Sequence, residues 1–254
     1  MNKTRIILCG ACGKMGGNVL SLLSDDNEAV AVCGVDLFPR EIGIPVYTSF
    51  DQIQEEADVI IDFSSADNLQ ERLEYAKTHK LGIVLASTGF TVEHLALIAE
   101  YATTTAIFKT ANLSLGVNLM QALCKAAAQV LGDAYDVEII ERHHNLKKDA
   151  PSGTALMLAD TVNEAFDNQK HYVDGRSGIV GAREKSEIGM HAVRGGTIVG
   201  EHEVMFAGED EIITITHSAR SKRVFAVGAI RAAKYVNGKA AGMYEMKHLL
   251  AEEN

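Results

Sequence analysis

The sequence predicts an α/β fold in which a Rossmann-like, doubly wound parallel sheet is joined to a smaller α+β domain with an open mixed sheet. Three observations lead to this prediction. A glycine-rich turn separates the first apolar run from the first helical segment. Short apolar runs then alternate with helical segments as far as Ser114, which is typical of a parallel sheet. Beyond Ser114, longer runs rich in Val, Ile and Thr replace that alternation.

The turn after the first strand has the spacing of a dinucleotide-binding motif. Residues 5–9 form an apolar run, and glycines then recur at three-residue intervals before a helical pattern over residues 19–23. Glycines let the backbone approach a pyrophosphate, and the positive end of the helix dipole favours its charge. We therefore expect the whole turn to bind the cofactor; it comprises Gly10, Ala11, Cys12, Gly13, Lys14, Met15 and Gly16.

The second strand, residues 29–36, favours the interpretation that the glycine turn binds a nucleotide over the alternative of a tight turn without a ligand. It ends in Asp36, twenty positions after Gly16, where a carboxylate accepts hydrogen bonds from ribose hydroxyls. The same carboxylate repels a 2′-phosphate. We expect NADH to be favoured over NADPH, with use of both cofactors if Lys14 or Arg40 offsets the repulsion.

Three further strands are predicted at residues 58–63, 82–86 and 106–109, with helices near residues 68–78 and 92–101. Ligands of such sheets bind at the carboxyl ends of the strands. Polar or small residues follow each of these runs, at 62–64, 87–89 and Asn112. The pattern predicts a cofactor crevice along this edge.

The second half is expected to be an α+β unit followed by a helical tail. A helix over residues 117–131 ends at Gly132, and strands follow at residues 135–141, 189–194, 197–206 and 211–217. Residues 166–186 have the composition of a mobile surface excursion. The tail is helical from residue 221, with one helix ending at Asn237 and a shorter one over residues 243–249.

The run from Glu141 to Ala155 has the composition of an anion site, because it combines two imidazoles, two ammonium groups and the start of a helix. Pro151 fits a first helical turn, and Asp149 or Ser152 can cap it. The backbone N–H groups of Ser152, Gly153 and Thr154 would then be unpaired and would point at a bound carboxylate.

Composition excludes several classes of protein. A net charge of −10 and the lack of a Lys/Arg-rich segment argue against nucleic-acid binding. We expect no membrane association, because the apolar runs are too short for a secretory signal or a membrane span. The four cysteines lack disulfide spacing, which favours the cytoplasm, and Cys9 and Cys12 are expected to be structural. The histidines lack zinc-ligand spacing, so no metal site is predicted.

Together these segments resemble the dihydrodipicolinate reductase family over nearly the whole chain. The resemblance is carried by residues 10–16, 86–90, 110–114, 141–155 and the tail from Thr216. It implies NAD(P)H-dependent reduction of dihydrodipicolinate, or of its 4-hydroxy-tetrahydro form, to tetrahydrodipicolinate in lysine and diaminopimelate biosynthesis. It adds Ala86, Ser87, Thr88, Thr110, Ala111, Asn112 and Leu113 to the expected cofactor-binding residues.

The resemblance also implies a domain division and an assembly. Residues 1–114 would bind the dinucleotide, residues 115–219 would bind substrate and form the oligomer, and residues 220–254 would return to the dinucleotide-binding domain. The open sheet leaves one face without helices, which could simply be solvated. The family resemblance favours a homotetramer assembled through that face.

Several residues are candidates for the chemistry on the small-molecule dicarboxylate substrate. Lys147 can bind a carboxylate and stabilise charge developing on the ring, and either Lys147 or His143 can deliver the proton. His144, Ser152, Gly153 and Thr154 are expected to bind substrate, whereas Lys148 is left outside the site. Arg194 and Arg220 could each complete a carboxylate clamp or form an interface salt bridge.

Two alternatives remain open from the residues alone. Another NAD(P)-dependent two-domain dehydrogenase would share the nucleotide motif, although no convincing nucleophilic Cys lies in the second domain. A non-catalytic dinucleotide sensor would need no acid or base. The combination of His143 and Lys147 disfavours the sensor.

Overall fold

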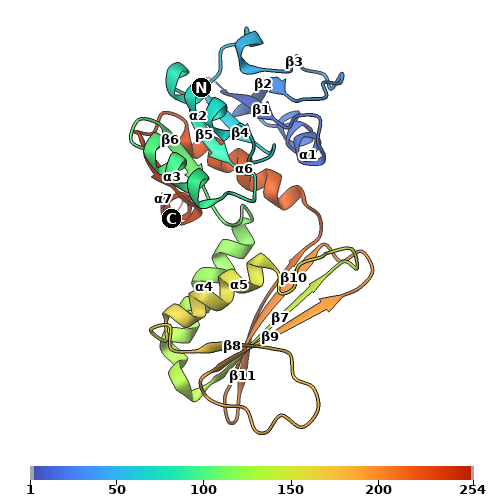
Figure 1. Ribbon diagram of the computed structural model, residues 1–254, viewed down its shortest axis with the longest axis vertical. Helices are drawn as coiled ribbons and strands as arrows, with labels where there is room; N and C mark the ends of the chain where they lie inside the picture. The colour runs from blue at the N-terminus through green and yellow to red at the C-terminus, as the bar shows by residue number, and fades with distance from the viewer. Residues whose placement is uncertain (1–2, 253–254) are drawn as a thin grey trace. The chain divides into compact units, whose positions relative to one another are not determined.

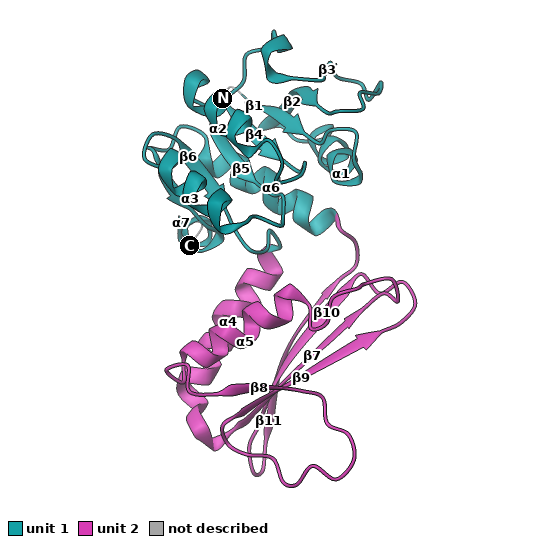
Figure 2. Cartoon of the chain, in the orientation of Figure 1, with its two compact units in different colours: residues 1–114, 223–254 teal, residues 115–222 magenta. Residues whose placement is uncertain are grey.

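A computed structural model describes residues 3–252 of the chain (Figure 1). The chain forms two compact units, shown in Figure 2. One contains the residues up to Ser114 together with those from Arg223 onward, and the other contains Leu115–Lys222. The first unit is therefore discontinuous in sequence.

The first unit is built on a parallel sheet of seven strands among the described residues, in the order β12-β6-β5-β4-β1-β2-β3. The strands are β1 (Thr4–Cys9), β2 (Ala29–Val35), β3 (Val46–Tyr47), β4 (Val59–Asp62), β5 (Gly82–Leu85), β6 (Ala106–Lys109) and β12 (Gly242–Tyr244). The helices are α1 (Lys14–Leu23), α2 (Leu69–His79), α3 (Val92–Tyr101), α6 (Arg223–Val236) and α7 (Met246–Glu252).

The central strands of this sheet are apolar because helices cover both of their faces. Ile7, Ile60 and Ile83 are fully buried, and all four residues of β4 and of β5 are buried. Continuous burial explains why these strands lack the polar–apolar alternation of a half-exposed sheet. This confirms the predicted doubly wound class.

The C-terminal segment completes the first unit. β12 pairs in parallel with β6 at the edge of the sheet, and Gly228 of α6 packs against the backbone of Leu113. A Cβ at position 228 would lie 1.8 Å from the Leu113 carbonyl oxygen, so only glycine permits this approach. The prediction of a helix over residues 243–249 was wrong at its start, because Met243 and Tyr244 belong to β12.

The second unit carries an open mixed sheet in the order β11-β10-β7-β9-β8. Its elements are α4 (Leu115–Leu131), β7 (Asp136–His143), α5 (Gly153–Glu164), β8 (His171–Asp174), β9 (Glu187–Arg194), β10 (Gly200–Ala207) and β11 (Ile212–Ala219). β7 pairs antiparallel with β10 and parallel with β9. This confirms the predicted mixed sheet.

The helices α4 and α5 cover one face of this sheet, which we call the inner face. Met120, Leu158 and Phe206 are among the residues that form its core. Along β7 the side chains alternate strictly, and the inner positions are Val137, Ile139, Glu141 and His143. The inner row of β7 is therefore apolar at its start and carries two ionisable side chains, Glu141 and His143, at its C-terminal end.

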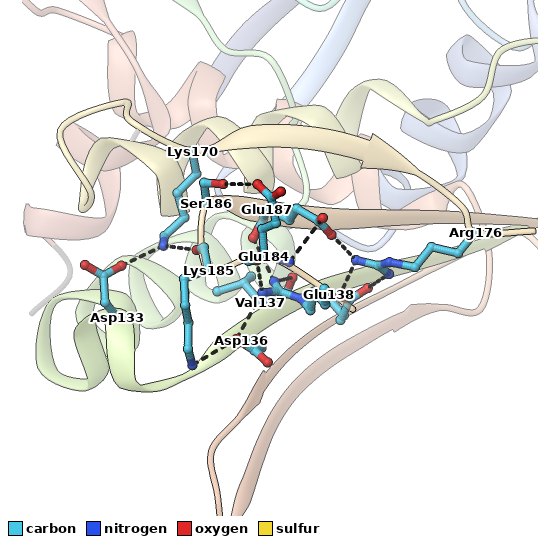
Figure 3. Close-up of polar contacts among 11 residues, drawn as sticks. Asp133, Asp136, Val137, Glu138, Lys170, Arg176, Glu184, Lys185, Ser186 and Glu187 are labelled. Carbon is cyan, nitrogen blue, oxygen red and sulfur yellow. Dashed lines mark hydrogen bonds and ion pairs between the residues drawn. The ribbon is translucent and has the colours of Figure 1, made fainter. Parts of the chain in front are cut away.

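The opposite, outer face of the sheet is crossed by a network of ion pairs (Figure 3). Glu138 of β7 accepts hydrogen bonds from Arg176, Arg183 and His191. Its carboxylate lies over Gly189, where a Cβ would be 1.8 Å from Oε2. The expectation that residues 166–186 are only a surface excursion was wrong, because His171–Asp174 form β8 and Arg176 and Arg183 anchor the loop that follows.

All four cysteines are free thiols in the structure. Among residues 3–252 no helix is both long enough and apolar enough to cross a membrane.

Candidate active site

The glycine turn of the first unit is tightly folded. Gly10 has a φ of +72°, and a Cβ there would lie 2.9 Å from the Phe63 carbonyl oxygen. At Gly16 a Cβ would lie 2.3 Å from the Ala11 carbonyl oxygen. The helix α1 begins directly after Gly13, which provides no side-chain cap. The turn therefore leaves the backbone N–H groups at the N-terminus of α1 without a side-chain cap, as a pyrophosphate site requires.

Asp36 lies beside this turn at the end of β2. Its Oδ2 accepts a hydrogen bond from the Cys12 N–H at 2.9 Å, and its Oδ1 accepts one from the Phe38 N–H at 3.0 Å. Arg40 donates to the Cys12 carbonyl at 2.6 Å. A cavity of about 320 Å³ opens here, lined by residues that include Gly10, Asp36, Phe38, Ser64 and Arg72. These residues fit the adenosine half of a dinucleotide.

Arg72, which lines this cavity, contacts two other groups of the protein. Its Nε lies 3.0 Å from Oδ2 of the fully buried Asp62, and its Nη2 donates to the Ser65 carbonyl at 2.6 Å. Arg40, which donates to the Cys12 carbonyl, and Lys14 of the turn are both exposed. The cations that could compensate a 2′-phosphate beside Asp36 are therefore solvent-exposed side chains, whose charge is screened by water and salt.

The other expected cofactor residues follow β5 and β6, at the same edge of the sheet as Asp36. Ala86 donates to the Asp62 carbonyl at 2.9 Å, and the Ser87 hydroxyl lies 3.4 Å from Asp62 Oδ2. Thr110 and Asn112 are tied together by short-range hydrogen bonds. None of the residues 86–88 or 110–113 lines the cavity beside Asp36, so their contact with a cofactor stays a prediction.

In the second unit, the end of β7 carries a buried carboxylate with three partners. Glu141 is 1 % exposed, and its Oε2 lies 2.6 Å from Nδ1 of His143. Arg194 binds both carboxylate oxygens, each at 2.7 Å, and the Ser152 N–H donates to Oε1 at 3.0 Å. Burial alone would raise the pKa of Glu141, but the hydrogen bonds from Arg194 and His143 hold it below its usual value.

The start of α5 differs in detail from the sequence prediction. Ser152 is the N-cap, and its Oγ accepts from the Ala155 N–H at 3.2 Å, whereas Asp149 does not cap the helix. Pro151 lies before the cap and not in the first turn. The Ser152 N–H, expected to be unpaired, is bound by Glu141. Gly153 has open space where a side chain would be, which leaves the backbone accessible.

Arg194 forms an ion pair within the chain, an arrangement that the sequence did not suggest. Its guanidinium binds Glu141 and also donates to the carbonyls of Asp149 and Val193. Since four of its five N–H donors are taken by these groups, it does not form a substrate clamp here. Arg220, the other candidate, is exposed after the end of β11.

Lys147 and His144 lie on the loop between β7 and α5. The Lys147 ammonium contacts both oxygens of Asp149, at 2.8 and 2.7 Å, and this contact lowers the pKa of the Asp149 carboxyl. Asp149 is mostly exposed, so water can replace it. Among the described residues, Nδ1 of His144 is buried and has no hydrogen-bond partner. Lys147 is therefore suited to receive an anion from outside, whereas Nδ1 of His144 can meet one only after it is uncovered.

The structure adds His202 to this site. It lies on β10 opposite Glu141, and its Nε2 is 2.9 Å from Oγ of Ser152. Desolvation, assisted by the neighbouring His143, lowers the pKa of His202 to about 4, so the ring is neutral near pH 7. No cluster of metal-binding side chains occurs within residues 3–252.

Sequence reasoning missed Glu141 and His202 as parts of this site. For Glu141 a signal was present, because residues two apart on a strand share a face and His143 follows it by two. A glutamate at an inner position after Val137 and Ile139 would need a charged partner. For His202 no such signal existed, since its neighbours come from other elements.

The nucleotide turn, the crevice beside Asp36 and the second unit with its basic loop define an NAD(P)-dependent oxidoreductase of two domains. Family models agree with this class. The model described as dihydrodipicolinate reductase, N-terminus, matches residues 4–113, and the model for the C-terminus matches residues 116–250. The chain belongs to the dihydrodipicolinate reductase family.

Individual relatives cover nearly the full length of the chain. A 4-hydroxy-tetrahydrodipicolinate reductase of Caldanaerobacter subterraneus is 46 % identical over 246 residues, which is 97 % of this chain and 98 % of that protein. One from Clostridium botulinum is 44 % identical over 247 residues, with the same coverage. A solved dipicolinate-bound dihydrodipicolinate reductase from Paenisporosarcina has the same fold, with a TM-score of 0.79, 24 % identity and coverage of 96 % and 98 %.

Proposed function

We propose that this chain reduces 4-hydroxy-tetrahydrodipicolinate, or dihydrodipicolinate, to tetrahydrodipicolinate with NAD(P)H in lysine and diaminopimelate biosynthesis. The observation that carries the proposal is the loop between β7 and α5, which presents Lys147, His144 and the start of a helix together. These groups suit a ring with two negative carboxylates. Full-length similarity to proteins named for this reaction supports the same substrate.

Substrate binding is assigned to groups that can exchange their present partners. Lys147 leaves Asp149 and binds a substrate carboxylate, which is a stronger partner once water is excluded. His144 donates or accepts at Nδ1, and the backbone at Gly153 and Thr154 receives a carboxylate at the positive end of α5. The dicarboxylate bound by the Paenisporosarcina relative supports this class of ligand.

Proton delivery to the ring falls to His143 or Lys147. His143 has Nδ1 engaged by Glu141, so any exchange takes place at Nε2. The Lys147 ammonium is 20 % exposed and contacts Asp149 Oδ2 at 2.7 Å. A reduced nicotinamide cofactor would supply the hydride. Residues 10–16 and Asp36 would hold that cofactor.

NADH is the preferred cofactor on this assignment. Asp36 is fixed beside the turn by two backbone N–H groups, and Arg72 is held by Asp62. A 2′-phosphate would therefore face this carboxylate, with the exposed Arg40 and Lys14 as the cations that could offset it. The ratio of kcat/KM for NADH and NADPH measures this directly, and a strong NADPH preference contradicts the role of Asp36.

Assembly and location are assigned as follows. The enzyme is a homotetramer formed through the outer face of the second sheet, which no helix of the second unit covers. It works in the cytoplasm, where its four cysteines stay reduced. Sedimentation equilibrium tests the tetramer, and monomers at micromolar concentration contradict it.

One assay tests the reaction. The chain is coupled to freshly generated product of the preceding synthase, and oxidation of NADH is followed by absorbance. We expect turnover by the wild type and a loss of about 100-fold or more in kcat for Lys147→Ala, with a raised KM for the substrate. No turnover by the wild type refutes the proposed function. Unchanged kinetics in Lys147→Ala removes Lys147 from the site.

A further inference from the structure

The carboxylate of Glu141 dictates which nitrogen of His143 carries a proton. An ionised carboxylate can only accept hydrogen bonds. Its Oε2 lies 2.6 Å from Nδ1 of His143, so Nδ1 must be the donor. In the neutral ring the lone pair is then on Nε2.

Glu141 is kept ionised by groups other than His143. Arg194 donates one hydrogen bond to each carboxylate oxygen, and the Ser152 N–H donates to Oε1. Both contacts favour the charged form of a carboxyl that is almost fully buried. A protonated Glu141 would lose these bonds, so the carboxylate cannot easily become a donor toward His143.

The contacts also fix where Nε2 lies. A Cβ at Gly200 would be 3.0 Å from Nε2, so the absence of a side chain there keeps this nitrogen uncrowded. The ring of His202 stands edge-on to that of His143, with centroids 5.2 Å apart. The imidazole is thus held by a carboxylate at one nitrogen and bordered by glycine at the other.

We propose that Glu141 is a positioning residue for the reduction, which locks His143 as the Nδ1–H tautomer and ties it to the helix cap at Ser152, while Arg194 keeps Glu141 ionised. This inference rests on the proposed function, because it assigns His143 to the reaction. Glu141 itself touches neither substrate nor cofactor. Its effect is to leave Nε2 able to give and take a proton without a change of tautomer.

In the Glu141→Gln variant we expect His143 to adopt the Nε2–H tautomer, opposite to that of the wild type. Oε1 of Glu141 receives two obligatory donors, Arg194 Nη2 and the Ser152 N–H, whereas Oε2 receives one, Arg194 Nη1. The oxygen of a glutamine therefore takes the Oε1 position, and Nη1 loses its acceptor. The amide NH₂ then takes the place of Oε2 and donates to His143. Nδ1 becomes the acceptor, and the proton moves to Nε2. Exchange at Nε2 is then blocked, since neutral His143 has no lone pair there.

A second glutamate on the same strand provides a matched control. Glu138 also pairs with arginines and with a histidine, His191 Nε2 at 2.6 Å, but it lies on the outer face. Glu138→Gln removes the same charge from the same strand. It changes the partner of His191 and leaves the partners of His143 in place.

The direct readout is the tautomer of His143 in protein labelled with [¹⁵N]histidine, measured by two-bond ¹H–¹⁵N correlation at pH 8. His143→Gln identifies the signals. We expect Nδ1–H in the wild type and in Glu138→Gln, and Nε2–H in Glu141→Gln. A wild type with Nε2–H overturns the inference, even if the glutamine variant fails to fold.

Kinetics give the second readout. We expect Glu141→Gln to lower kcat by about 100-fold or more, as loss of the correct tautomer does for other catalytic imidazoles, with the KM for NADH within about 2-fold. Glu141→Asp keeps an acceptor-only group and should recover part of kcat, whereas Glu138→Gln should stay within about 3-fold of wild type. Wild-type kcat in a Glu141→Gln variant with the flipped tautomer overturns the inference.

The two proposals fail in distinguishable ways. A wild type without turnover but with Nδ1–H in His143 contradicts the proposed function and leaves the tautomer assignment intact. An active wild type whose His143 carries its proton on Nε2 contradicts the positioning role alone.

Discussion

Two glutamates on β7 are three residues apart, lie on opposite faces of the sheet and are each bound by arginine and histidine. Glu138 on the outer face is held by Arg176, Arg183 and His191. Glu141 on the inner face is held by Arg194 and His143, with the Ser152 N–H as a third partner. The same combination of a glutamate, an arginine and a histidine therefore occurs in two different surroundings on one strand.

The difference lies in what each network connects. Glu138 joins the strand to the loop after β8 through two guanidinium groups, so one of them can be lost without leaving the carboxylate unpaired (Figure 3). Glu141 has a single cation, and its other side-chain partner is an imidazole with one nitrogen available for chemistry. The network around Glu138 therefore has more than one cation to stabilise its carboxylate. The network around Glu141, beside the proposed reacting groups, has only Arg194.

The largest expected effect follows from this difference in redundancy. Arg194→Met leaves the buried Glu141 without a cation, and breaking a buried pair in this way destabilises a protein by about 3–5 kcal/mol. Arg176→Met leaves Glu138 with Arg183 and His191, so we expect a loss of only about 1 kcal/mol. Urea unfolding at pH 7 measures both, and equal losses would contradict the comparison.

The Arg194→Met experiment has an internal check. In the double variant Arg194→Met with Glu141→Gln the uncompensated charge is gone, so about half or more of the lost stability should return. Additive losses would indicate that Arg194 acts through its packing and not through Glu141.

The acid side of the stability profile should depend on Glu138. Burial alone would raise the pKa of Glu138, but its hydrogen bonds from Arg176, His191 and Arg183 lower it from 4.5 to about 2. A depressed folded-state pKa stabilises the fold above pH 4.5, and that stabilisation is lost as the pH falls toward 2. Between pH 5 and pH 3 the wild type should lose about 2 kcal/mol more than Glu138→Gln. Chemical denaturation at each pH gives the difference.

That difference isolates one carboxyl. Glu141 is present in both proteins, so its own depressed pKa cancels in the subtraction. Parallel profiles of unfolding free energy against pH for wild type and Glu138→Gln would show that protonation of Glu138 does not change the stability of the fold.

The smallest expected effects come from adding one methyl group on each face. Gly189→Ala would place its Cβ 1.8 Å from Oε2 of Glu138 and displace that carboxylate from its partners, lowering stability by about 1–2 kcal/mol with little change in kcat/KM. Gly200→Ala would place its Cβ 3.0 Å from Nε2 of His143, lowering kcat/KM by about 5- to 10-fold with stability within about 1 kcal/mol.

Thermal unfolding and steady-state kinetics of the two alanine variants test this crossed pattern. A loss of activity in Gly189→Ala greater than in Gly200→Ala would reverse the functions assigned to the two faces.

The sequence predicted those parts of the fold that local periodicity encodes. The glycine turn, Asp36 and the buried strands β1, β4 and β5 follow from short-range patterns, and so does the mixed sheet of the second unit. The two-residue strand β3 and the edge strands β8 and β12 were missed. Such short edge segments form because a neighbouring strand offers unpaired backbone groups, and the local sequence carries little of that signal.

Within the candidate site, residue types were easier to predict than partners. His143, Lys147 and Ser152 stand out as chemistry-bearing residues in one run. That Arg194 binds Glu141, that Asp149 binds Lys147 and that His202 meets Ser152 depends on register between strands and on the path of a loop. Periodicity within one segment contains no information about that register.

The pairing of β12 with β6 has a consequence for synthesis on the ribosome. During translation, the edge of β6 (Ala106–Lys109) that pairs with β12 stays unpaired until Gly242–Tyr244 has been made. All of the second unit is translated in between. That unit is continuous and can fold while the nucleotide domain still exposes an open sheet edge, a state prone to association with other nascent chains. A message truncated before residue 242 would therefore yield a protein that chaperones retain, even though every residue of its glycine turn had already been made.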